Sequence, residues 1–71
     1  MYLVILEREK GKSITRRFKT LIEATDCARG FARHYHMYPE PPDSPDTWQH
    51  WWSKDGSRIT ARLSLREVAK K

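Results

Sequence analysis

Disulfides, membrane spans and leader segments have little support in this sequence. Cys27 is the single cysteine among 71 residues, so no internal disulfide can form, which favours a reducing compartment. The N-terminal apolar run is too short for a signal segment or a membrane span, because charged residues follow it at once. We therefore expect a cytoplasmic protein without membrane contact.

Motifs for catalysis and cofactor binding are also missing. Three scattered glycines form no phosphate-binding loop, and no serine or cysteine stands in a nucleophile motif. His34 and His36 are two residues apart on an expected helix, where zinc ligands would be three or four apart. We expect no metal, no cofactor and no enzymatic activity. A metal-free nuclease that uses Arg33, His34 and His36 is the alternative.

Positive charge is what the chain has in excess. Fourteen Lys and Arg oppose nine Asp and Glu, a formal net charge of +5. Glu40, Asp43 and Asp46 lie in a proline-rich segment without Lys or Arg, so the rest of the chain is more basic still. Such a field attracts polyanions, which include nucleic acid and acidic protein surfaces. The alternative is an ordinary solvated surface.

The chain is long enough for one domain, residues 1–71. Residues 2–8 are apolar at both parities, which predicts a central strand. They form a hairpin (residues 2–19) with the alternating residues 12–19. A tight turn at Lys10-Gly11 pairs Leu3 with Phe18 and directs Tyr2, Val4 and Leu6 away from the buried face. A longer loop would change this register.

A helix is expected at residues 20–36, because Thr20 and Glu23 form a capping box. Its inner arc consists of Leu21, Ala24, Cys27, Ala28, Phe31, Ala32 and Tyr35. Residues 37–47 contain all four prolines and predict an extended loop, either a linker or an acidic docking segment. Residues 66–71 fit one helical turn or a continued strand equally well.

Asp55-Gly56 predicts a two-residue turn in a second hairpin, residues 48–65. This register pairs Trp52 with Ile59 and Trp48 with Leu63, so both indoles face the core, as does His50. The opposite face then holds Gln49, Trp51, Ser53, Arg58, Thr60, Arg62 and Ser64. The expected fold is α+β with the order ββαββ, a four-stranded, mostly antiparallel sheet and one helix on one face. The first strand is expected beside the last.

The sheet face without the helix is the predicted interaction surface. Trp51 between Arg58 and Arg62, with an apolar patch beside it, is typical of a protein–protein interface or a homodimer. The predicted partner-binding residues are Tyr2, Gln49, Trp51, Arg58 and Arg62. Alternatively, the same face binds single-stranded nucleic acid directly, helped by Arg16, Arg17, Lys19, Arg29 and Arg33. A third interpretation is structural, with the proline-rich segment covering Trp51.

The ββαββ outline, with a helix that opens Thr20-Leu21-Ile22-Glu23-Ala24, resembles small phage and mobile-element proteins of the anti-CRISPR kind. The resemblance lies in size and layout and carries over no residue. It implies a compact inhibitor that occupies the surface of a nucleic-acid-handling complex. The predicted function is therefore a small, basic, non-enzymatic protein that binds a protein or ribonucleoprotein target.

Overall fold

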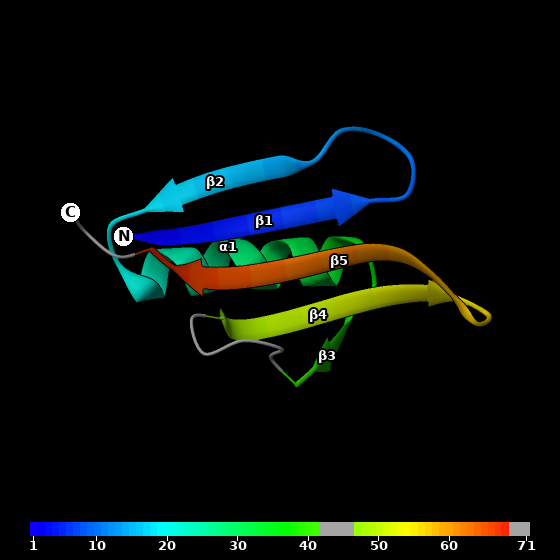
Figure 1. The fold of residues 1–71 in the computed structure, drawn as a ribbon. Coiled ribbons are helices and arrows are strands. Elements are labelled where there is room, and N and C mark those ends of the chain that lie inside the picture. The colour runs from blue at the N-terminus through cyan, green and yellow to red at the C-terminus, as the bar shows by residue number, and fades with distance from the viewer. Residues whose placement is uncertain (42–46, 69–71) are drawn as a thin grey trace.

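A computed structural model describes residues 1–41 and 47–68. Within these residues, one antiparallel sheet has the strand order β2-β1-β5-β4-β3, and one helix, α1, packs on one of its faces (Figure 1). The α+β prediction and the order of the four expected strands are confirmed, but the sheet has five strands instead of four. The elements are β1 (Tyr2–Arg8), β2 (Ile14–Phe18), α1 (Leu21–His34), β3 (Tyr38–Glu40), β4 (Thr47–Asp55) and β5 (Arg58–Glu67).

The additional strand, β3, lies in the segment that was expected to be a loop. Tyr38, Pro39 and Glu40 pair with β4 at one edge of the sheet. Proline is tolerated in an edge strand, because an edge strand has a neighbour on one side only and the backbone N–H groups on its other side have no strand to bond. The loop prediction for residues 37–47 is therefore wrong at β3, while residues 42–46 lie outside the described part.

The helix begins where its capping box predicts. The Thr20 hydroxyl accepts a hydrogen bond from the Glu23 backbone N–H at 3.2 Å and donates one to Glu23 Oε1 at 2.9 Å. Ala24 and Ala28 are fully buried against the sheet, and the other members of the predicted inner arc pack around the core. The helix ends at His34, and His36 then adopts a left-handed conformation with φ of 52°.

The core lies between α1 and the two central strands, where Val4, Leu6, Leu63 and Leu65 are fully buried. This differs from the predicted first hairpin, because Tyr2 pairs with Phe18 and Leu6 with Ile14. The connection takes up residues 9–13 instead of a tight turn. This shift of one residue in the pairing exchanges the two faces of β1, so Leu3 and Ile5 lie on the side of the sheet away from the helix.

The connection between β1 and β2 is held by Arg8, whose guanidinium donates to the Lys12 carbonyl at 2.8 Å. At the other end of the sheet β5 runs to Glu67, so the strand interpretation of the tail holds that far, and residues 69–71 lie outside the described part. In the part of the chain that the structure describes, no helix is long and apolar enough to cross a membrane.

Candidate binding surface

The hairpin of β4 and β5 turns one residue later than predicted. Asp55 pairs with Arg58, so Gly56 and Ser57 form the tip, and Gly56 has φ of 64°. Two register shifts interrupt the pairing, one between Thr47 and Gln49 and one between Ser53 and Lys54. A bulge inserts one unpaired residue and changes which side chains share a face.

The second shift decides the orientation of two neighbouring indoles. Lys54 pairs with Ile59 but Ser53 pairs with Ala61, so Thr60 is the extra residue on β5. Beyond it Trp51 lies opposite Leu63 on the helix side, 8% exposed, and Trp52 lies opposite Arg62. The prediction that Trp51 points outward between Arg58 and Arg62 is therefore wrong, as is the burial of Trp52 in the core.

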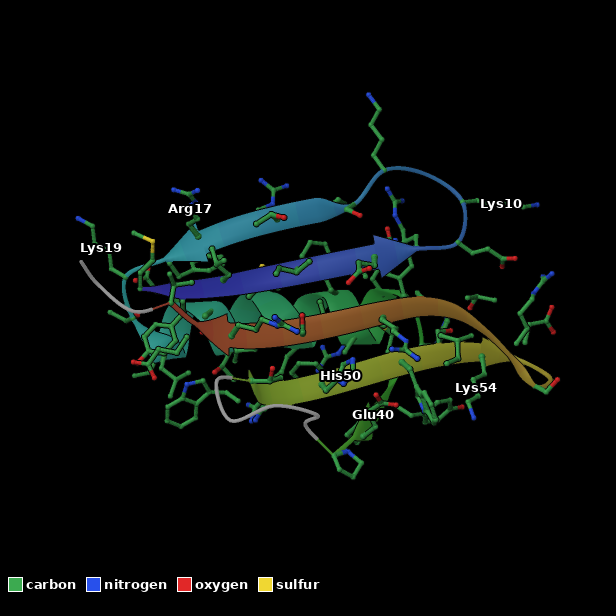
Figure 2. The ribbon with its side chains drawn as sticks, in the orientation of Figure 1. Lys10, Arg17, Lys19, Glu40, His50 and Lys54 are labelled. Carbon is green, nitrogen blue, oxygen red and sulfur yellow. The ribbon has the colours of Figure 1, made fainter. Side chains whose placement is uncertain are left out.

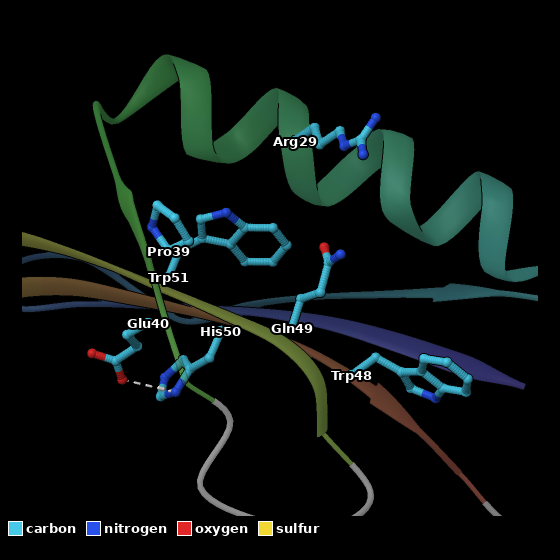
Figure 3. A pocket seen from close by; sticks show the side chains of 7 residues that line it. All are labelled: Arg29, Pro39, Glu40, Trp48, Gln49, His50 and Trp51. Atoms are coloured by element: carbon cyan, nitrogen blue, oxygen red, sulfur yellow. Dashed lines mark ion pairs between the residues drawn. The ribbon is translucent and has the colours of Figure 1, made fainter.

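In the third, structural interpretation of the sequence, the proline-rich segment covers Trp51. Pro39 of β3 is its neighbour across the strand pair, and both line the same side of the sheet (Figure 3). The structural interpretation of Trp51 thus fits the observed packing. The outward position belongs to Trp52, which is half-buried.

Trp52 stands among two cations and a second ring. Arg62 lies opposite it on β5, and Tyr38, 66% exposed, lies opposite it on β3. Lys54 follows two residues later on the same face, and its Nζ lies 3.8 Å from the centroid of the Trp52 ring. That distance is typical of a cation–π contact. An aromatic pair flanked by Lys and Arg therefore occupies one end of this face.

We define the open face as the side of the sheet away from α1, which is turned toward the viewer in Figures 1 and 2. Arg17, Leu3 and Arg66 form one row across it, and Thr15, Ile5 and Ser64 form the next. Leu3 and Ile5 are half-buried at its centre. Its cations are Arg17, Lys54, Arg62 and Arg66, and its carboxylates are Glu7 and Glu40.

Glu40 on the open face is paired with His50. Nδ1 of His50 lies 2.8 Å from Oε1 of Glu40, and the two side chains are only 7% and 15% exposed (Figure 2). Nδ1 has no well-aligned acceptor, so the two side chains are in close contact without an ideal hydrogen bond. His50 is buried, as predicted, but on the face opposite the helix. The pair joins β3 to β4, and it leaves the Glu40 carboxylate largely buried.

A groove of about 310 Å³ lies on the other side, between α1 and β4 (Figure 3). It brings together Trp51, Gln49 and Arg29, which the sequence placed in two separate predicted sites. Trp48 lies at one end of the groove and is half-exposed. The ring of Tyr2 is edge-on to the Trp48 ring, with 6.4 Å between the two centroids, and Nε1 of Trp48 donates a hydrogen bond to Glu67 Oε1 at 3.2 Å. The expected core position of Trp48 is therefore wrong.

The remaining predicted residues are dispersed. Near the hairpin tip, Nη1 of Arg58 lies 3.3 Å from Oε1 of Glu9. Arg17 and Arg62 share the open face, whereas Arg16 lies on the helix side of β2. Lys19 is exposed just before the start of α1, and Arg33 is exposed in the last turn of α1.

Sequence reasoning missed four residues of the open face, namely Tyr38, Trp52, Lys54 and Arg66. The spacing of Trp52 and Lys54 was an available signal, because residues two apart on a strand share a face. No sequence feature marked the bulge at Thr60 that turns this face outward.

Within residues 1–41 and 47–68, no three His, Cys, Asp or Glu side chains are grouped so that they could hold a metal ion. Comparison of the chain with family models, with curated proteins and with solved structures finds no match. The site must therefore be interpreted from its own chemistry.

Proposed function

We propose that the protein is a non-enzymatic binding protein whose open face binds single-stranded nucleic acid. The observation that carries this proposal is the cross-strand pair of Trp52 and Tyr38 beside Lys54 and Arg62. Bases of a single strand stack on aromatic rings on a sheet, while Lys and Arg contact the phosphates. Sequence-independent binding of this kind needs no enclosed pocket.

Electrostatics supports the same target. The open face carries four cations, and Glu7 is its one carboxylate apart from the paired Glu40 among the described residues. Arg17 and Arg66 lie across Leu3 from each other, and Arg62 stands farther along β5. A strand that runs from Tyr38 toward Arg17 would meet Lys54 and Arg62 near one end of the face and Arg66 and Arg17 near the other, with Leu3 and Ile5 between them.

Lys54 occupies the position on the Trp52 ring where a base of the nucleic acid would stack. Its ammonium group now lies over the Trp52 ring, at 3.8 Å from the centroid, where a stacked base would lie. Lys54 is exposed on a flexible side chain, so it can move to a phosphate when a base takes its place. The cation–π contact is then replaced by base stacking and a charge-assisted contact.

Fluorescence anisotropy with a labelled oligothymidylate tests the proposal. Trp52→Ala should weaken binding by about 5- to 150-fold, because one stacked base contributes about 1–3 kcal/mol. The matched control is Trp48→Ala, which removes a half-exposed indole on the helix side and should leave affinity nearly unchanged. Equal losses in the two variants, or no binding by the natural chain at low salt, would reject the open face as the binding surface.

A second candidate function is docking on a protein or ribonucleoprotein target by the same face, as in inhibitors of the anti-CRISPR kind. Leu3 and Ile5, half-buried between Arg17, Arg62 and Arg66, favour it, because interfaces often have an apolar centre with arginines around it. Capture from a cell lysate with and without nuclease separates the two. Loss of all captured material after nuclease treatment supports nucleic acid as the target, whereas a retained protein supports the second function.

A further inference from the structure

The two edges of the sheet are built differently. β3 is three residues long with a proline at its centre, whereas β2 has five residues and no proline. β2 pairs with β1 on its inner side, and in the described part of the chain no element lies beyond its outer side (Figure 1). An outer strand directs a row of backbone N–H and C=O groups away from the sheet. β2 can therefore form a row of hydrogen bonds to an added strand, whereas the short, proline-containing β3 can form far fewer.

Apolar side chains extend the β2 edge on its helix side. Ile14 and Phe18 are half-buried there and pack against the core, as do Cys27 and Phe31 of α1. A strand added beside β2 would cover the exposed remainder of these side chains. The gain in apolar burial would add to the backbone hydrogen bonds.

Both faces of β2 also carry a cation. Arg16 lies between Ile14 and Phe18 on the helix side, and Arg17 lies on the open face. Both are exposed, and the described structure records no ion pair with an acidic side chain for either. Carboxylates on a neighbouring strand would be directly opposite these guanidinium groups, where opposite charges stabilise the pairing.

We propose that β2 is the docking edge for an extended, acidic segment of a partner protein. That segment adds as a further strand, with apolar residues beside Ile14 and Phe18 and acidic residues beside Arg16 and Arg17. A second copy of this chain is a poor occupant, because full antiparallel overlap of two β2 strands places Arg16 opposite Arg16. The inference does not depend on nucleic-acid binding by the open face.

A synthetic peptide with Val-Glu-Glu-Thr-Val at its centre tests whether the side chains of β2 select an acidic partner. Isothermal titration calorimetry measures its affinity. The peptide should bind the natural chain, and the same peptide with Lys in place of Glu should not. Arg16→Glu should weaken the acidic peptide by about tenfold and allow the basic peptide to bind. The matched control, Arg62→Glu, makes the same change of charge on the open face and should leave that preference unchanged.

Two N-methylated versions of the acidic peptide test the backbone part. Methyl groups on one set of alternate residues face β2 and should abolish binding, whereas methyl groups on the other set face away and should be tolerated. Equal affinity of the two versions would overturn strand addition. Failure of the natural chain to bind the acidic peptide would overturn it as well, and would assign Arg16 and Arg17 to keeping the edge unpaired. Circular dichroism checks that Arg16→Glu, a change at an exposed position, keeps the fold.

Discussion

Trp51 and Trp52 are adjacent in the sequence and have the same side chain, yet they belong to opposite faces of the sheet. Trp51 is buried on the helix side of the sheet beside Leu63, and Trp52 stands on the open face beside Arg62 and Lys54. The first contributes to the core and the second to a surface. Composition alone could not distinguish a core indole from a candidate binding residue here. One bulge on the partner strand made the distinction.

The comparison is tested most strongly by replacing each indole in turn. Trp51→Ala should lower the free energy of unfolding by about 3–5 kcal/mol, which is most of the stability of a small domain. Trp52→Ala should cost much less, because its side chain is only half-buried. Urea denaturation followed by circular dichroism measures both values. Similar losses for the two variants would contradict the assignment of the indoles to different faces.

A second test compares cations on the two sides of the molecule. Arg62→Ala and Arg29→Ala each remove one positive charge, from the open face and from the helix respectively. If the open face contacts phosphates, Arg62→Ala should make the slope of log affinity against log salt shallower by about 0.7 for a single strand. Arg29→Ala should leave that slope unchanged. The reverse result would move the phosphate contacts to the helix side.

The smallest expected effect concerns Cys27 on the covered side. Burial raises the pKa of its thiol, and the positive charge of Arg16 offsets only part of that rise. The folded chain therefore holds less reactive thiolate than the unfolded chain at the same mildly alkaline pH, and iodoacetamide should react more slowly with it. Mass spectrometry of alkylation, with and without denaturant, measures the ratio. A faster reaction in the folded chain would show that the thiol lies outside the covered layer.

The same shift has a consequence for stability. Because the pKa of Cys27 is higher in the folded state than in the unfolded state, its contribution to stability is present below the unfolded value. It is lost as pH rises through the folded value. Cys27→Ser should reduce this alkaline loss, which denaturation at several pH values can follow.

Elements with local signals were predictable from the sequence. Thr20 and Glu23 mark the helix start, because the cap is formed within four residues, and the alanines Ala24 and Ala28 mark the inner arc. The neighbours of β1 followed from its apolar residues at both parities. These features depend on short stretches of chain, where propensity and periodicity act directly.

Register was not predictable in the same way. The position of Val4 depended on the length of the first loop, and the position of Trp51 on an unpaired Thr60. Either feature changes one residue of spacing and exchanges all side chains between faces. β3 was missed because three residues around Pro39 have no strand pattern of their own and are held by β4. On this hairpin the sequence placed Arg62 on the open face, where it lies, but assigned to Trp51 the outward position that Trp52 occupies.

The short, proline-containing strand β3 also limits how large an assembly can become. A sheet that could accept strands at both edges would allow each bound copy to recruit another, and filaments would grow without an end. Pro39 makes one edge of this sheet a poor acceptor. Any strand that joins the β2 edge would therefore complete a particle of fixed, one-to-one stoichiometry.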